Sequence, residues 1–121
     1  TSHALFLIVF NLRDFETHET AELEHIKGWI KSIHLHAPNA PVLLVGTCLD
    51  EIGRKNTLVD ISNGLDARLD LQMISSERNV SSVDLSFFPI SNLTSEGIEV
   101  LRQKIEEVTR KQAHVKKLVP L

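Results

Sequence analysis

The sequence predicts an α/β fold in which three parallel strands alternate with three helices. Two observations carry this prediction: three short apolar runs rich in β-branched or aromatic residues, and a stretch of helical periodicity after each run. Continuous apolar runs are typical of strands that are covered on both faces, as in parallel sheets. Strands that alternate with helices favour right-handed crossovers, which place the helices on the faces of the sheet.

The first strand and the first helix are expected in the first third of the chain. Residues 4–10 form the longest apolar run, and a helix is predicted over residues 16–36 with Thr17 as its N-cap. Trp29 on this helix is expected to pack in the core or at an interface. The turn sequence at residues 37–41 ends the helix. The helical spacing is carried by Glu22, Ile26, Trp29, Ile30 and Ile33.

The other elements continue the alternation. The second and third strands are expected at residues 41–46 and 83–90, and the second and third helices at residues 54–76 and 95–112. Asn63-Gly64 interrupts the apolar stripe of the second helix without ending it. The stripes consist of Leu58, Ile61, Leu65, Leu69 and Met73 in the second helix and of Ile98, Leu101, Ile105 and Val108 in the third.

Length, charge and cysteine content narrow the class of protein. A chain of 121 residues is long enough for one core but not two, so we expect a single domain or a fragment of one. The net charge of -3 excludes the basic surface of a nucleic-acid or membrane-surface binder. Cys48 is the only cysteine, which excludes an internal disulfide and fits the cytoplasm. The run at residues 4–10 is far below the ~20 residues that span a bilayer and lacks the features of a signal peptide.

Two polar loops follow predicted strands and are candidates for a ligand site. In parallel α/β sheets ligands bind beyond the carboxyl ends of the strands. Asp50 lies just past the second strand, where its carboxylate can accept two hydrogen bonds at once, from the ring N1–H and the exocyclic amine of guanine. A backbone N–H near Asn92, after the third strand, can meet the guanine carbonyl oxygen and reject the amine of adenine. The two loops together predict a guanine-selective site.

The residues of these loops resemble the motifs of a known family. Thr47-Cys48-Leu49-Asp50 resembles the Asn/Thr-Lys-x-Asp base motif of Ras-like GTPases, and Ser91-Asn92-Leu93 resembles their Ser-Ala-Lys loop. Cys48 and Leu93 stand where most small GTPases have lysine. The apolar run, the tryptophan of the first helix, the turn after it and the residues before the aspartate are similar to Roc domains, the Ras-like domains of Roco proteins. The segments that carry this narrower resemblance are residues 4–9, Trp29, residues 37–40 and residues 45–47.

The resemblance implies the C-terminal half of a Roc domain over residues 1–121, with a partial Ras-like, P-loop NTPase fold. Residues 113–121 resemble the start of the connection to a COR domain. The implied ligands are GTP and GDP with Mg2+, whose site would lie in the other half of the domain. The parent protein would be a signalling protein, with a COR domain and in some relatives a Ser/Thr kinase. The implied nucleotide-binding residues are Thr47, Cys48, Asp50, Ser91, Asn92 and Leu93.

The chain lacks the phosphate-binding motif of this fold. No Gly-x-x-x-x-Gly-Lys-Ser/Thr occurs, so no nest of backbone N–H groups with its lysine can hold the β and γ phosphates. Hydrolysis of GTP is therefore expected only in the intact domain. For the chain itself we expect no catalytic residue and no metal ligand.

Association is expected at the first strand. In a Ras-like sheet the strand at residues 4–10 lies beside the P-loop strand, so here it becomes an edge that can pair with another chain. We expect a homodimer, a swapped assembly or an N-terminal segment that completes the sheet. The alternative is a monomer whose edge is shielded by the loop at residues 11–16.

Plainer interpretations stand beside each candidate residue. Asp50 can cap the next segment or lie solvated in a turn, Thr47 can be an ordinary strand end, and Ser91 and Asn92 can serve turn chemistry. Cys48 is read as a small, semi-buried side chain and not as a nucleophile. His34 and His36 invite a metal site, but residues two apart point away from each other on a helix. Two other functions are considered for the chain as a whole. One is an interaction module that has lost nucleotide binding. The other is a receiver-like or flavodoxin-like domain, which is disfavoured because the sequence has no acidic cluster and no phosphate loop.

Overall fold

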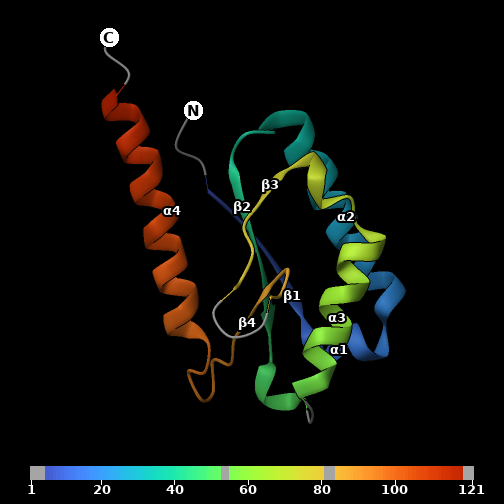
Figure 1. The fold of residues 1–121 in the computed structure, drawn as a ribbon. Coiled ribbons are helices and arrows are strands. Elements are labelled where there is room, and N and C mark those ends of the chain that lie inside the picture. Colours follow the sequence, from blue (N-terminus) through green and yellow to red (C-terminus); the bar gives the residue numbers. More distant parts are fainter. Residues whose placement is uncertain (1–4, 53–54, 81–83, 119–121) are drawn as a thin grey trace.

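The chain folds into a parallel β-sheet with helices on both faces (Figure 1). The computed structural model describes residues 5–52, 55–80 and 84–118. The predicted α/β class is confirmed. The strands are β1 (Phe6–Asn11), β2 (Pro41–Thr47), β3 (Ser75–Ser76) and β4 (Phe88–Pro89); the helices are α1 (Leu12–Thr17), α2 (Glu19–His36), α3 (Lys55–Arg68) and α4 (Ile98–Leu118), with short 3-10 turns η1 (Leu49–Glu51) and η2 (Leu71–Met73).

Strand β2 is the centre of the sheet. Strand β1 runs parallel to it along its whole length, from the pair Phe6↔Val42 to the pair Asn11↔Thr47. On the other side of β2, β3 pairs with its beginning and β4 with its end, both in parallel. The polar loops after β2 and β4 therefore emerge at the same end of the sheet, at the bottom of Figure 1.

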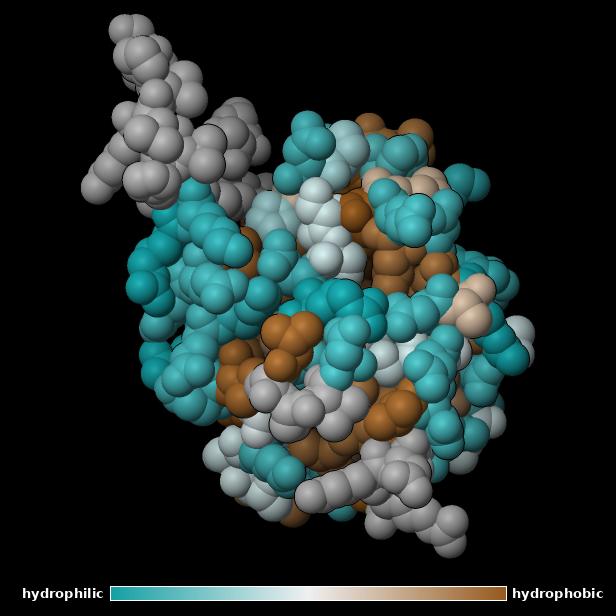
Figure 2. Space-filling model, in the orientation of Figure 1, coloured by the Kyte–Doolittle hydropathy of each residue, from teal (hydrophilic) through white to brown (hydrophobic). Residues whose placement is uncertain are grey.

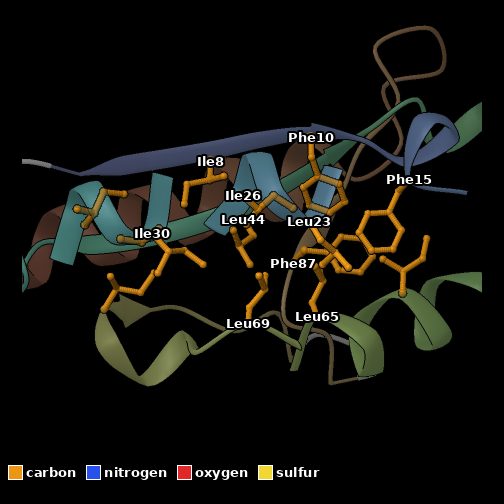
Figure 3. Close-up of a cluster of buried hydrophobic side chains, with 14 of the residues drawn as sticks. Ile8, Phe10, Phe15, Leu23, Ile26, Ile30, Leu44, Leu65, Leu69 and Phe87 are labelled. Carbon is orange, nitrogen blue, oxygen red and sulfur yellow. The ribbon is translucent and has the colours of Figure 1, made fainter. Parts of the chain in front are cut away.

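One face of the sheet packs against α1, α2 and α3. Ile8 and Phe10 of β1 point to this face, where α2 and α3 cover them (Figure 3). Phe87 lies in the same cluster and is fully buried, with its ring centroid 5.5 Å from that of Phe10 in an edge-on arrangement. Burial of this cluster is the main source of stability for the fold. Its other buried members are Leu12, Phe15, Leu23, Ile26, Ile30, Ile33, Val42, Leu44, Ile61, Leu65, Leu69 and Ile74.

Helix α4 packs on the opposite face, but it covers only part of that face. Leu43 and Val45 of β2 lie under α4 and are 0% and 2% exposed. Their register neighbours on β1, Leu7 and Val9, are 45% and 51% exposed. The outer surface of α4 is mostly hydrophilic (Figure 2), as expected for a helix with one buried stripe. The half-covered face thus leaves an apolar strip along β1.

The first half of the chain differs from the expectation in two ways. The predicted N-cap Thr17 is the last residue of a separate short helix, α1, and its hydroxyl donates back to the carbonyl of Arg13. The long helix begins two residues later, at Glu19, and its cap residue His18 makes no side-chain cap. Trp29 is 52% exposed, so it is not a core residue, because the buried stripe of α2 is centred on Leu23, Ile26, Ile30 and Ile33.

In the second half, three predicted elements have other boundaries than expected. The second helix ends at Arg68 instead of residue 76, because the chain turns there to bury Ile74 and to pair β3 with β2. The third strand is only Phe88–Pro89, since Leu85 pairs instead with Asn79 in an antiparallel bridge. The last helix begins at Ile98, and its predicted stripe is confirmed, with Leu101 and Val108 buried. Residues 4, 54 and 83 of the predicted elements lie outside the described residues. So do residues 119–121 of the predicted COR connection, whereas residues 113–118 continue α4.

Candidate functional site

The two polar loops at the carboxyl edge of the sheet are joined by a side-chain hydrogen bond. The hydroxyl of Ser91 donates to Oδ1 of Asp50 at 2.7 Å. Ser91 has no exposed surface, and its oxygen also accepts a hydrogen bond of 3.1 Å from the backbone N–H of Thr94. Asp50 itself is exposed. A buried hydroxyl therefore orients a carboxylate that remains open to solvent.

Backbone hydrogen bonds hold the two loops in one arrangement. The N–H of Ile90 donates to the carbonyl of Gly46 at 2.8 Å, and the N–H of Leu49 donates to the carbonyl of Ile90 at 3.0 Å. These bonds continue the β2–β4 ladder past the end of the strands. The distance between Asp50 and Ser91 is thus set by the sheet and not by flexible loop ends.

Cys48 turns the chain sharply between β2 and Asp50. Its φ of 64° lies in the left-handed region, which is uncommon for a residue other than glycine and is often found at functional sites. The side-chain amide of Asn11 donates to its sulfur at 3.3 Å, while the Asn11 oxygen caps α1 by accepting from the backbone of Arg13 and Asp14. Asn11 therefore links α1 to the turn that carries Asp50.

The thiol of Cys48 is not activated. Hydrogen bonding to Glu51, then burial, raise the pKa of this thiol above its ordinary value. A raised pKa lowers the thiolate fraction at neutral pH, and the thiolate is the nucleophile. This agrees with the interpretation of Cys48 as a small, partly buried side chain.

Thr47 stabilises the sheet next to the site. Its hydroxyl donates to the carbonyl of Phe10 at 3.2 Å and so ties the end of β2 to the end of β1. The ion pair of Arg13 with Glu51, at 3.0 Å between exposed side chains, ties α1 to η1 in the same region. Both contacts fix the ends of the loop that carries Asp50: Thr47 at its start and Glu51 just after Asp50.

Asn92 and Leu93 project from the loop after β4. Asn92 is exposed, and Leu93 is 82% exposed, although it is a large apolar side chain. The loop closes through the N–H of Ser91, which donates to the carbonyl of Glu96 at 2.9 Å. Leu93 therefore projects into solvent from a loop whose base is fixed by backbone hydrogen bonding and by the bond between Ser91 and Asp50.

Gly97 shapes this loop and was not singled out from the sequence. Its φ of 81° lies in the left-handed region, and a Cβ there would lie 2.0 Å from the carbonyl oxygen of Pro89. Only glycine allows the loop to pass so close to β4 before α4 begins. The sequence did contain a signal for this residue, because a glycine near the start of a predicted helix indicates a special backbone conformation. Asn11 was also missed, because its contact with Cys48 joins residues 37 positions apart.

The arrangement offers an oriented acceptor and an exposed apolar side chain. No cluster of three His, Cys, Asp or Glu side chains able to hold a metal ion occurs among the described residues. His34 and His36 are exposed at the end of α2, and the ring of His34 bonds to the carbonyl of Met73. In the same described part of the chain, no helix is long and apolar enough to cross a membrane.

Fold and site together define the class of structure. A parallel sheet with helices on both faces, with two hydrogen-bonded polar loops at its carboxyl edge, is consistent with a partial Ras-like arrangement. No family model matches the chain.

The chain is distantly similar to a small region of Roco-family proteins of Dictyostelium discoideum. Cyclic GMP-binding protein C is 24% identical over 120 residues, which are 99% of this chain and 4% of that protein. The probable serine/threonine-protein kinase roco5 is 29% identical over 106 residues, 87% of this chain and 3% of that protein. The probable serine/threonine-protein kinase pats1 is 25% identical over 99 residues, 82% of this chain and 3% of that protein. The chain thus corresponds to a small part of each of these long relatives.

Proposed function

We propose that this chain is the guanine-recognising half of a Roco-type GTP- and GDP-binding domain in a cytoplasmic signalling protein. The observation that carries the proposal is the hydrogen bond from buried Ser91 to exposed Asp50. A carboxylate that only capped a turn would need no buried donor 41 positions away in the sequence. The distant similarity to Roco-family proteins supports the same assignment.

The proposed chemistry matches the hydrogen-bonding edge of guanine. The Asp50 carboxylate accepts from the ring N1–H and from the exocyclic amine, both of which guanine presents on one edge. The buried Ser91 hydroxyl holds Oδ1 in place, so little side-chain entropy is lost on binding. A backbone N–H near Asn92 meets the guanine carbonyl oxygen, whereas adenine presents an amine there and is rejected.

The remaining candidate residues surround the base. Leu93 is exposed on the loop that carries Ser91 and offers apolar contact to the face of a purine ring. Cys48 takes the position of the lysine in the family's Asn/Thr-Lys-x-Asp motif. Its left-handed backbone turns the chain from β2 into η1, which carries Asp50. Thr47 acts indirectly, because its hydroxyl is bound to the carbonyl of Phe10.

Phosphate and magnesium would be bound by the other half of the intact domain. The residues described here offer no metal cluster, and the sequence has no P-loop. This chain therefore supplies base selectivity, while affinity for the triphosphate, and any hydrolysis, require the rest of the domain.

A second candidate function is protein interaction without nucleotide. It is favoured by two large apolar side chains on the surface of β1, Leu7 and Val9, which are 45% and 51% exposed. Exposed apolar patches of this kind mark interaction surfaces. This surface and the Asp50 site involve different residues, so protein interaction here would not require a bound nucleotide.

Base recognition can be tested on the chain itself by NMR titration with GDP and ADP at millimolar concentration. We expect GDP to shift the amide signals of residues 49–51 and 91–93, and ADP to leave them in place. Asp50→Asn should abolish the GDP shifts, and Asp70→Asn, which changes an exposed carboxylate elsewhere, should not. Equal shifts with both nucleotides, or none with either, would contradict guanine recognition by these loops.

A further inference from the structure

Asn11 lies at the junction of β1 and α1 and forms two kinds of hydrogen bond with the two ends of its side-chain amide. Its oxygen accepts from the backbone N–H groups of Arg13, at 2.9 Å, and Asp14, at 3.1 Å, and so caps α1. Its nitrogen donates to the sulfur of Cys48 at 3.3 Å. Because two backbone donors identify the oxygen, the nitrogen of this planar group has to face Cys48.

The backbone of Cys48 needs support from its surroundings. Its φ of 64° is a left-handed conformation, which persists in a residue with a side chain only where neighbouring contacts hold it. Cys48 is the N-cap of η1, and its carbonyl accepts from the N–H of Glu51 at 3.0 Å. A rotation of the backbone at Cys48 would therefore turn η1 and change the direction of the Asp50 carboxylate.

The same junction of β1 and α1 also contacts the loop on either side of Asp50. Before it, the hydroxyl of Thr47 donates to the carbonyl of Phe10 at 3.2 Å. After it, Arg13 pairs with Glu51 at 3.0 Å, between side chains that are 58% and 38% exposed. An exposed ion pair adds little to global stability, but it draws this carboxylate toward α1. The loop is thus attached to the junction at several points, and the amide contact lies between them.

We propose that Asn11 is a positioning residue of the guanine site, an inference that rests on the proposed function. The loop of Asp50 follows the central strand β2, and it is held from both neighbouring strands. From the side of β4, the hydroxyl of Ser91 fixes one carboxylate oxygen. From the side of β1, the amide of Asn11 fixes the backbone turn from which that carboxylate extends. Asn11 thereby contributes to base recognition without touching the base.

A plainer role for Asn11 is that of a helix cap alone. A cap needs only the side-chain oxygen, and serine or aspartate serves at this position as well as asparagine does. The amide nitrogen is the part that the cap does not use and that contacts Cys48. The two roles can therefore be separated by Asn11→Ser, which keeps a capping oxygen and removes the amide donor.

The hold on the loop can be measured in the full 121-residue chain without nucleotide, by NMR-detected amide hydrogen exchange. Asn11→Ser should raise the exchange rate of the Glu51 N–H about threefold to tenfold, the range expected when one hydrogen bond is lost. The N–H of Leu44, which is buried in the middle of β2, should keep its rate, and thermal unfolding should stay cooperative. An unchanged exchange rate of Glu51 would overturn the proposal.

The consequence for recognition is measured by titration of the same variant with GDP. Asn11→Ser should raise the dissociation constant about threefold to tenfold. Asn63→Ser is the matched control, because Asn63 is exposed in α3, and it should leave the constant unchanged. Equal GDP binding by Asn11→Ser and the wild type would overturn the role of Asn11 and leave the proposed function standing. Absence of GDP shifts in the wild type would instead contradict the proposed function, and this role with it.

A double-variant cycle tests whether Asn11 acts through Cys48. Cys48→Ala removes the sulfur that accepts from the amide, while alanine still requires the same support for a left-handed backbone. In this background Asn11→Ser should cause no further change in the exchange rate of the Glu51 N–H, because the contact is already lost. An effect of equal size in both backgrounds would show that Asn11 acts only by capping α1 and would overturn the proposal.

Discussion

Ser91 and Asp50 form a hydrogen bond of 2.7 Å in which the buried partner orients the exposed one. The serine oxygen is held in turn by the backbone N–H of Thr94. A hydroxyl that both donates to a carboxylate and accepts from the backbone has a single orientation. The relationship therefore gives Asp50 a fixed direction at the carboxyl edge of the sheet, and it is the basis of the first two predictions.

Ser91→Ala should destabilise the fold by about 1–3 kcal/mol, because it leaves the N–H of Thr94 without its acceptor and Asp50 without its donor. Urea denaturation monitored by circular dichroism measures this change in the free energy of unfolding. Ser32→Ala, at an exposed position of α2, is the control and should change stability by less than about 0.5 kcal/mol. Equal stability of the Ser91 variant and the wild type would show that the bond does not contribute.

Asp50→Asn, made in a domain that includes the phosphate-binding half, should weaken guanine nucleotides by about 1.5–3 kcal/mol. This is the usual contribution of hydrogen bonds to a charged group. The new amide should favour xanthine, whose additional carbonyl accepts from it. Competition binding with GTP and xanthosine triphosphate measures both effects. Unchanged GTP affinity without a gain for xanthosine triphosphate would assign Asp50 a structural role.

The isolated chain should bind GTP weakly, without tight binding in calorimetry. The base-reading loops form only one part of the contacts, and the triphosphate has no nest of backbone N–H groups to hold it here. Addition of Mg2+ should not strengthen binding, because the described residues contain no cluster of metal ligands. A submicromolar dissociation constant for GTP would contradict this expectation.

Gly97→Ala should destabilise the fold strongly, by about 1–3 kcal/mol for the left-handed backbone alone. The close approach to the Pro89 carbonyl oxygen adds to this cost. Gly28→Ala is a matched control, because Gly28 lies in α2 with nothing within 4 Å of the new methyl group. It should stabilise the helix by about 0.5–1 kcal/mol. Thermal unfolding of the two variants should therefore move in opposite directions.

The elements that could be predicted from the sequence are those specified by local patterns. The apolar runs place β1 and β2, and the helical stripes place α2 and α4, because burial on one or both faces imposes a period on the residues themselves. The same logic places Asp50 and Ser91 at one end of the sheet, since parallel strands end on the same side. The class of fold and the position of the candidate site follow from these patterns alone.

The tertiary structure decided what depends on residues far apart in the sequence. The end of α3 at Arg68 and the short strand β3 arise because Ile74 is buried and Ser76 pairs with Val42, which no local pattern announces. Which hydroxyl holds Asp50 is settled by two loops that only the β2–β4 pairing brings together.

Exposure, too, was decided only by tertiary packing. Leu7 and Val9 belong to a run typical of a strand covered on both faces, yet they are half exposed because α4 lies over β2 and β4 and stops short of β1. Trp29 is on a helix whose neighbours in spacing are buried, yet it is 52% exposed and packs edge-on against His25. The sequence shows which side chains are apolar, but the packing of the folded chain determines which of them are buried.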